Sequence, residues 1–214
     1  MTRADRQRQA RDVTRRAILD AALDLFVADG YSQVSIRNIA ARVGYSPAAI
    51  YSYFESKDDI FYALAEEGFR LLGAAQMSET ASADALEDIR KVVRRVYDFS
   101  KRQPQYFALV FLDRRVPRIG RESERFAFMQ EIKEAIRSRM QRCVDEGIFA
   151  PSVEAQACLR LLLAPVFGLV LMHQSGRLGP NEDTDALVYS AIETTIAGLR
   201  AGAVPAPHIP EETS

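Results

Sequence analysis

Apolar residues recur along the first part of this chain at the three- and four-residue spacing of an α-helix. The first such stripe comprises Ile18, Ala21, Ala22, Leu25 and Phe26. A glycine at position 30 ends it, and Gly44 ends a second, shorter stripe over residues 36–43. Ser46 and Pro47 are the residue types of an N-cap and a first helical position, so we expect a third helix over about residues 46–53.

The helical pattern continues through most of the remaining chain, with no strand-like alternation between hairpin turns. Residues 56–59 (Ser-Lys-Asp-Asp) resemble a capping box that opens a long fourth helix. Because proline or glycine separates the later apolar segments, we expect helices near residues 84–102, 104–113, 120–146, 153–175 and 184–201. The sequence therefore predicts an all-α protein.

Charged residues are distributed unevenly along the chain, although its net charge is only −1. Residues 1–57 contain nine Lys/Arg and six Asp/Glu, whereas the remaining 157 residues contain nineteen and twenty-three. The basic excess is concentrated in six arginines: Arg3, Arg6, Arg8, Arg11, Arg15 and Arg16. Such a segment is typical of an arm that touches nucleic acid, and equally of a solvated, disordered N-terminus.

Several functional classes lack support in the sequence. We find no run of about 18 apolar residues, so we expect no membrane span, and the N-terminus has no apolar core of a secretion signal. Cys143 and Cys158 sit in apolar helical contexts, as buried thiols in a reducing cytoplasm would. His173 and His208 have no partners at metal-ligand spacing, so we expect no metal and no cofactor. Catalytic spacings are missing too, and we expect no enzyme.

The second and third predicted helices are joined by a four-residue break around Gly44 and Tyr45, which is a helix-turn-helix arrangement. In this arrangement the second helix of the pair can lie in the major groove of DNA. Ile50 and Phe54 would face the core. The opposite face would present Ser46, Ala48, Ala49, Tyr51, Ser52 and Tyr53. Small residues allow close approach to base edges, and tyrosine hydroxyls can bind phosphate; the tyrosines could instead only cover a small core.

This face carries no Arg, Gln or Asn, the residues that most often read bases in pairs of hydrogen bonds. Direct readout of the base sequence is therefore expected to be limited. The arginine-rich arm could compensate from the minor groove, or the shape of the operator could contribute.

Residues 15–64 resemble the DNA-binding domain of the TetR family of bacterial transcriptional regulators. The matching segments are ILDAALDLFVADGY, SIRNIAARVG, the spacing S-x-x-x-I-Y-x-Y-F, and SKDDIF. The resemblance implies that a recognition helix led by Ser46, Pro47, Ala48 and Ala49 contacts DNA. It also implies phosphate contacts from the second helix and beyond, at Ser35, Arg37, Tyr51, Tyr53 and Lys57. Beyond residue 64 the chain shares only length and helical character with the family.

The resemblance also implies a domain division and a dimer. We expect a flexible basic arm over residues 1–14, a three-helix helix-turn-helix domain over 15–57, a larger helical ligand-binding and dimerisation domain over 58–202, and a flexible tail over 203–214. The last two helical segments are richer in apolar and small residues than one buried face requires. They are candidates for a homodimer interface, or they are core helices of a single subunit.

Proline at position 165 would bend the penultimate helix and open space toward aromatic side chains. By family resemblance, a small inducer would bind there. The candidate contacts are Phe107, Phe111, Arg114, Phe128, Met129, Phe167 and His173. Such a lining favours an apolar or amphipathic molecule, although the same side chains could simply be core.

The sequence as a whole thus predicts a cytoplasmic repressor that a small ligand releases from a palindromic operator. The alternative is a helical ligand-binding or adaptor protein that has lost DNA binding.

Overall fold

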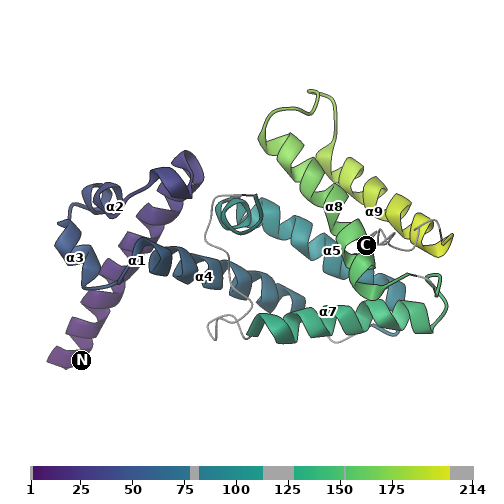
Figure 1. The fold of residues 1–214 in the computed structure, drawn as a ribbon, viewed down its shortest axis with the longest axis horizontal. Coiled ribbons are helices and arrows are strands. Elements are labelled where there is room, and N and C mark those ends of the chain that lie inside the picture. The colour runs from purple at the N-terminus through teal and green to yellow at the C-terminus, as the bar shows by residue number, and fades with distance from the viewer. Residues whose placement is uncertain (1, 78–81, 113–127, 152, 203–214) are drawn as a thin grey trace, which may run out of the picture. The chain divides into compact units, whose positions relative to one another are not determined.

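The computed structural model describes residues 2–77, 82–112, 128–151 and 153–202, and these residues are helical without a strand (Figure 1). They form two compact units. Unit 1 combines Met1–Gly73 with Phe99–Ala127, and unit 2 combines Ala74–Asp98 with Phe128–Ser214. This division differs from the expected boundary after residue 57, because most of the fourth helix packs with the helix-turn-helix.

Unit 1 begins with α1 (Arg3–Asp29), the short 3-10 turn η1 (Tyr31–Gln33), α2 (Ile36–Val43) and α3 (Pro47–Tyr51). Residues 57–73 of α4 (Lys57–Met77), which are 17 of its 21 residues, complete its bundle. One apolar core joins these helices, as the sequence pattern predicts. Its fully buried side chains include Ile18, Ala22, Phe26, Ile39, Ile50, Ile60, Phe61 and Leu64. The five-residue α3 has little helical stability of its own, so this core must hold it in place.

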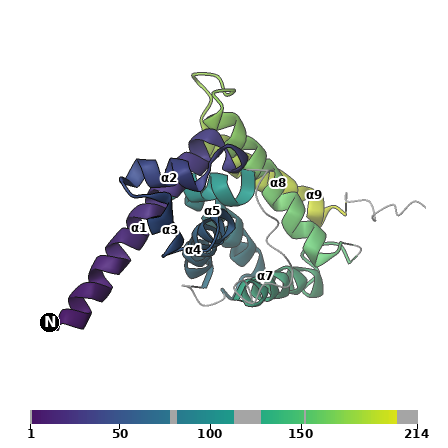
Figure 2. The same ribbon diagram turned by 60° about the vertical axis from the view of Figure 1, so that its left-hand side comes forward.

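The arginine-rich segment is helical rather than a separate arm. α1 starts at Arg3, where Thr2 accepts a hydrogen bond from the Asp5 backbone and Asp5 accepts one from the Thr2 backbone. This capping box satisfies amide groups that a free helix end leaves unpaired. Figure 2 shows the first turns of α1 extending beyond α2 and α3. The apolar pattern begins only at Ile18, so hydrophobic periodicity did not reveal these turns.

A second segment of unit 1, α6 (Pro104–Phe107) followed by the π-helical turn η2 (Ala108–Leu112), packs against α1. Arg16 of α1 connects three helices at this place. Its Nη1 donates to both carboxylate oxygens of Glu67 at 2.7 Å, and its Nη2 donates to the Tyr106 hydroxyl at 3.3 Å. Burial alone would lower the pKa of Arg16, but hydrogen bonds to Asp20, Glu67 and Tyr106 raise it above its ordinary value.

Unit 2 contains the greater part of α5 (Ala85–Arg102), together with α7 (Phe128–Asp145), α8 (Ala155–Gln174) and α9 (Thr184–Arg200). α8 packs most extensively against α9 and also against α7. Two polar contacts join α5 to α9. Arg90 forms a bidentate pair with Glu193 at 2.8 Å for each bond, and the Tyr97 hydroxyl donates to Asp185.

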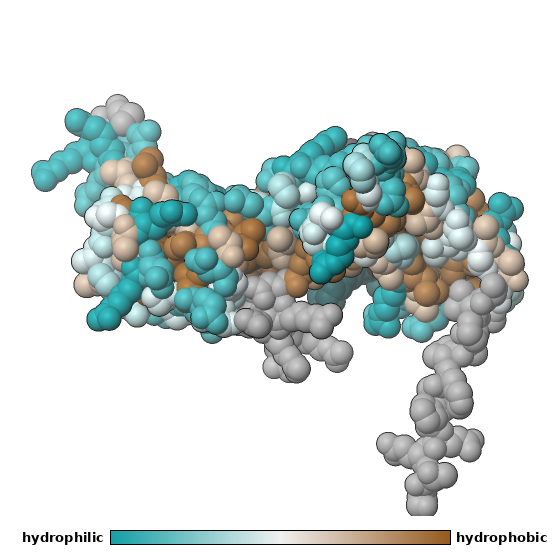
Figure 3. Space-filling view, turned by 90° about the horizontal axis from the view of Figure 1, so that it is seen from above, coloured by the Kyte–Doolittle hydropathy of each residue, from teal (hydrophilic) through white to brown (hydrophobic). Residues whose placement is uncertain are grey.

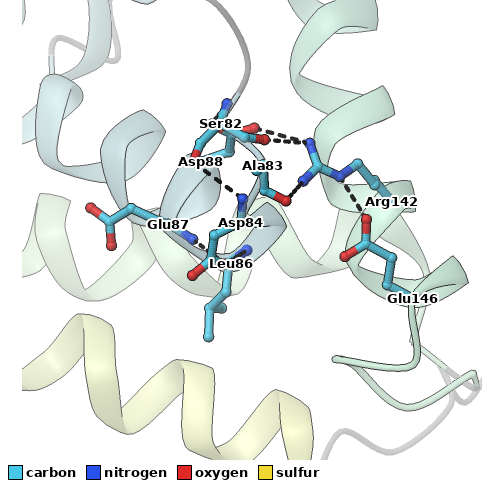
Figure 4. Close-up of polar contacts among 8 residues, drawn as sticks. All are labelled: Ser82, Ala83, Asp84, Leu86, Glu87, Asp88, Arg142 and Glu146. Carbon is cyan, nitrogen blue, oxygen red and sulfur yellow. Dashed lines mark hydrogen bonds and ion pairs between the residues drawn. The ribbon is translucent and has the colours of Figure 1, made fainter.

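Arg142 of α7 holds the segment that leads into α5 (Figure 4). Its two Nη atoms donate to the carbonyls of Ser82 and Ala83 at 3.0 and 2.7 Å, and to Asp88 at 3.3 Å. Asp88 is buried and also accepts from the Ser82 amide at 2.7 Å, while Glu146 accepts from the Nε of Arg142 at 2.8 Å. Because the buried carboxylate is paired with a cation and an amide, its burial is compensated.

α8 carries two apolar faces. One is buried against its neighbours and includes Cys158, Leu162, Val166 and Val170. The other is exposed and includes Leu161, Ala164, Gly168 and Leu171. With a mean hydropathy of 1.9 over 18 residues, α8 is by length and composition alone apolar enough to cross a membrane, which differs from the expectation of no such segment. Apolar residues also reach the surface of this unit in the view from above (Figure 3).

Candidate nucleic-acid interface

The turn between α2 and α3 has the local geometry that the sequence predicts. Ser35 caps α2 by accepting from the Asn38 amide at 3.2 Å. Gly44 ends α2 in the left-handed conformation with φ 72°, and the Tyr45 amide donates to the Ala40 carbonyl at 2.9 Å. A residue with a Cβ rarely adopts this φ, so glycine is required for the sharp change in direction.

α3 is shorter than expected, ending at Tyr51 rather than near residue 53. Ser46 caps its start by accepting from the Ala49 amide at 3.2 Å. At its end the Ser52 hydroxyl donates to the Ala49 carbonyl at 2.6 Å, which competes with helical bonding of that oxygen. The helix nevertheless presents a defined face, because Ile50 is buried completely beneath it.

The surface of α3 that faces away from the core is small and polar. Ser46, Pro47, Ala48 and Ser52 are exposed, and Tyr51 exposes 55% of its surface. Ala49 and Tyr53 are half-buried at its edges. Ser35 and Arg37, at the start of α2, are exposed too, and Arg37 makes no ion pair within the described ranges. The structure thus brings nine of the ten residues that the sequence proposes for DNA to the surface of one small bundle.

The tenth, Lys57, is half-buried, and its ammonium is bound by the protein itself. Its ammonium donates to the carbonyls of Tyr31 and Val34, both at 2.9 Å, and lies 4.0 Å from the centroid of the Tyr31 ring. Burial lowers the pKa of Lys57. Two of its three donors are therefore used to fix the segment before α2, and one remains for a phosphate.

Two arginines that the sequence interpretation assigned to the N-terminal basic segment lie beside α3. Arg11 Nη2 lies 3.4 Å from the Ser52 carbonyl, and its guanidinium lies 5.7 Å from the centroid of the Tyr53 ring. The Arg15 guanidinium lies 5.0 Å from the centroid of Phe54. Spacing along the sequence could have indicated the positions of Arg11 and Arg15, because both continue the three- and four-residue steps of the buried stripe.

The candidate ligand residues are divided between the two units. In unit 1, the rings of Phe107 and Phe111 lie 5.2 Å apart, and Phe111 meets Phe69 edge-on at 6.0 Å. In unit 2, the half-buried candidates are Phe128, Met129 and Phe167. His173 is exposed, with its Nδ1 3.0 Å from the Thr184 hydroxyl, and Arg114 lies outside the described residues.

Two models of known protein families match parts of this chain. A model described as bacterial regulatory proteins of the tetR family matches residues 18–64. A second, described as a tetracyclin repressor-like C-terminal domain, matches residues 89–195, which is half of the chain. The chain belongs to the TetR family. The second match corrects the expectation that likeness to the family ends near residue 64, because helical periodicity alone could not distinguish a family-specific domain from any other bundle.

TetR-family relatives extend over much of the chain. The transcriptional repressor AcnR of Corynebacterium efficiens is 25% identical over 190 residues, covering 86% of this chain and 92% of AcnR. The transcriptional activator FasR of Mycolicibacterium smegmatis is 29% identical over 105 residues, which spans about half of each protein, 49% and 48%. These relatives and the family matches identify the chain as a DNA-binding transcriptional regulator.

The fold agrees with solved structures of TetR-family proteins. The crystal structure of PfmR from Thermus thermophilus is similar to this chain with a TM-score of 0.64 and 24% identity, covering 86% of this chain and 97% of PfmR. This likeness establishes the arrangement of an N-terminal helix-turn-helix and a helical C-terminal domain.

Proposed function

We propose that this TetR-family regulator is a repressor that binds a palindromic operator as a homodimer, with α3 of each subunit in a major groove. The observation that carries the proposal is the exposed face of α3. Ala48 and Ala49 leave its N-terminal end without bulk, so the backbone can approach base edges and thymine methyl groups. Ser46 and Pro47 lead the helix with these alanines, Ser52 and Tyr53 also face the DNA, and the proposed phosphate contacts are Ser35, Arg37, Tyr51 and Lys57.

A dimer is proposed because one helix of five residues makes few contacts with DNA. The exposed apolar face of α8, formed by Leu161, Ala164, Gly168 and Leu171, supports it. Its small residues at positions 164 and 168 allow two helices to approach closely, and burial of its leucines against a second copy removes apolar surface from water. An interface between two copies would also explain the hydropathy of α8 without a membrane. We therefore propose a cytoplasmic location.

The ligand that we propose is apolar or amphipathic, because its candidate contacts are mainly aromatic. Phe107 and Phe111 are the proposed contacts in unit 1, joined by the adjacent Phe69. The other residues of the expected ligand set are Phe128, Met129, Phe167 and His173, which belong to unit 2, and Arg114, which lies outside the described residues. Binding of this ligand and of DNA must weaken each other by the same factor, typically by about 1–3 kcal/mol.

The experiment that tests DNA binding is selection of fragments from genomic DNA, followed by fluorescence anisotropy with the selected duplex and a scrambled duplex. Tyr51→Phe is expected to weaken binding to both duplexes alike, because it removes a phosphate contact. Ala48→Leu is expected to change the preferred sequence, because it adds bulk against the bases. Failure of the wild-type dimer to bind any duplex at low salt would favour the alternative, a protein that has lost DNA binding.

Ligand release is tested with lauric and palmitic acid as amphipathic probes, and with decane-1,10-diol as an uncharged one. A probe that binds is expected to lower operator affinity about 5- to 150-fold. Phe111→Ala is expected to weaken probe binding without changing operator affinity in its absence. If a bound probe leaves operator affinity unchanged, the release mechanism is wrong while DNA binding stands.

A further inference from the structure

α1 carries one continuous stripe whose chemistry changes from apolar to basic along its length. From the core outward, the stripe is formed by Phe26, Ala22, Ile18, Arg15, Arg11 and Arg8, each three or four residues from the next. Such residues share one face of a helix. The apolar members are buried in unit 1, and the arginines are exposed where the helix continues past its core.

The arginines of this stripe approach α3 at its C-terminal end. Arg15 lies over Phe54, and Arg11 lies beside both the Ser52 carbonyl and the Tyr53 ring. One turn farther along the same face, Arg8 follows Arg11 by about 4.5 Å along the helix axis. The stripe therefore adjoins the part of α3 that is proposed to contact the DNA backbone.

The charges of this stripe are not neutralised within the described part of the protein. In those ranges, none of Arg8, Arg11 and Arg15 forms an ion pair with a carboxylate. Arg16, on a different face of α1, is the contrast, because it is paired with Asp20 and Glu67. Arginines without a carboxylate partner, fixed on a helix face beside a proposed DNA surface, have the charge that fits phosphates.

We propose that the N-terminal turns of α1 form a second DNA-contact element, in which Arg8, Arg11 and Arg15 bind phosphates of the duplex that α3 engages. This inference rests on the proposed function and adds a surface to it. An α-helix with its side chains is about 10–12 Å wide, whereas the minor groove is about 6 Å wide. The helix is therefore proposed to lie outside the minor groove and to contact the backbone, as an alternative to the expected arm that reads bases there.

The test compares full-length dimers that lack two charges on different faces of the N-terminal turns of α1. Arg8→Gln with Arg11→Gln removes the stripe, and Arg3→Gln with Arg6→Gln removes equal charge from the rest of the helix surface. Operator affinity is measured by anisotropy from about 50 to 300 mM KCl, with operator and scrambled duplexes. For the first pair we expect the salt dependence to flatten by about 0.9 in slope for each lost phosphate contact, on both duplexes. The control pair is expected to change it much less.

A third variant keeps every charge and removes the helix. Ala10 is exposed in the middle of the extension, so Ala10→Pro interrupts the helix without disturbing the core. Because proline is tolerated at the start of a helix, Arg11 and Arg15 stay on the shortened helix, and the salt dependence is expected to flatten by the share of Arg8 alone. Circular dichroism should show lost helix with an unchanged thermal midpoint. Arg8→Gln alone serves as a further check, because Arg8 makes no hydrogen bond or ion pair with the described residues of the free protein.

Three outcomes would overturn the inference. Equal effects of the two arginine pairs would mean that only net charge matters. A loss confined to the operator would mean that the arm reads bases, and normal binding by Ala10→Pro would mean that it acts as a flexible chain. In each case the wild-type dimer still binds its operator, so failure of this inference is distinct from failure of the proposed function.

Discussion

Family resemblance implies that Lys57 and Tyr51 both contact phosphate, but the two side chains have different surroundings in the free protein. The Lys57 ammonium is bonded to two backbone carbonyls and rests over an aromatic ring. The Tyr51 side chain is largely exposed, and no hydrogen bond from its hydroxyl is present in the described part of the chain. Loss of DNA affinity on changing Lys57 therefore combines a lost contact with a disturbed fold.

Replacement of Lys57 by methionine is expected to lower the free energy of unfolding by about 1–3 kcal/mol, because two carbonyls lose a charged donor. Tyr51→Phe is expected to change it by less than about 0.5 kcal/mol. Urea denaturation of both variants and the wild type measures the difference. Equal stability of all three would show that water replaces the ammonium without cost.

The two buried thiols offer a test that is independent of DNA. Burial raises the pKa of Cys143 and of Cys158 to about 11. Since the thiolate is the reactive form, alkylation of the native protein at about pH 8 should be far slower than in guanidinium. The stability that these neutral thiols contribute is fully present below their unfolded pKa and is lost as pH rises through about 11. Rapid alkylation of the native protein would contradict this burial.

At the scale of elements, α4 and the α6–η2 segment pack most closely at Gly68. A Cβ added there would lie 3.1 Å from a ring carbon of Tyr106 and 3.3 Å from a methyl group of Val110. Both contacts are tighter than ordinary van der Waals packing, so the neighbouring segment would have to move. This contact joins α4 to the segment that also carries Phe107 and Phe111 of the candidate ligand set.

Gly68→Ala is accordingly expected to destabilise the protein by about 1–3 kcal/mol through overpacking. Val110→Ala in the same chain should recover part of this loss, because it removes one of the crowded methyl groups. Thermal or urea unfolding of the two single variants and the double variant completes the cycle. Strictly additive losses would show that the two side chains do not meet.

The sequence predicted those elements whose signals are local. Ser35, Gly44 and Ser46 occupy the caps and the left-handed position that their chemistry indicates. The first turns of α1 escaped prediction because arginines in an exposed helix leave no apolar periodicity. The division of residues 104–112 into α6 and a π-turn was also not predicted, since it depends on packing rather than on residue type. Motif spacing and family resemblance led to the proposed DNA surface, which stays a prediction, and the position of Arg11 beside Ser52 required the tertiary structure.

At the scale of the whole molecule, the proposed dimer would cover the exposed face of α8. Leu171 exposes 49% of its surface on a helix that is apolar on two faces. Surface of this kind is unfavourable in water, and a twofold interface buries it in both copies at once.

Leu171→Asp is expected to convert the dimer to a monomer and to abolish operator binding at concentrations where the wild type binds. Sedimentation velocity gives the mass, and anisotropy gives the affinity. Val27→Asp is the control, because Val27 is an exposed apolar residue of α1 in the other unit. A dimer that survives Leu171→Asp would place the interface elsewhere.

Arg16, which is hydrogen-bonded to Glu67 and Tyr106, lies partway along the continuous helix α1. Arg8, the outermost of the three proposed phosphate contacts, lies eight residues away, or about 12 Å along the axis. A tilt of about 10° at Arg16 would therefore move Arg8 by about 2 Å, which is enough to break a charged hydrogen bond. Small displacements near Tyr106 would in this way be magnified along the helix, and the proposed contact of Arg8 with the operator would be lost before those of Arg11 and Arg15.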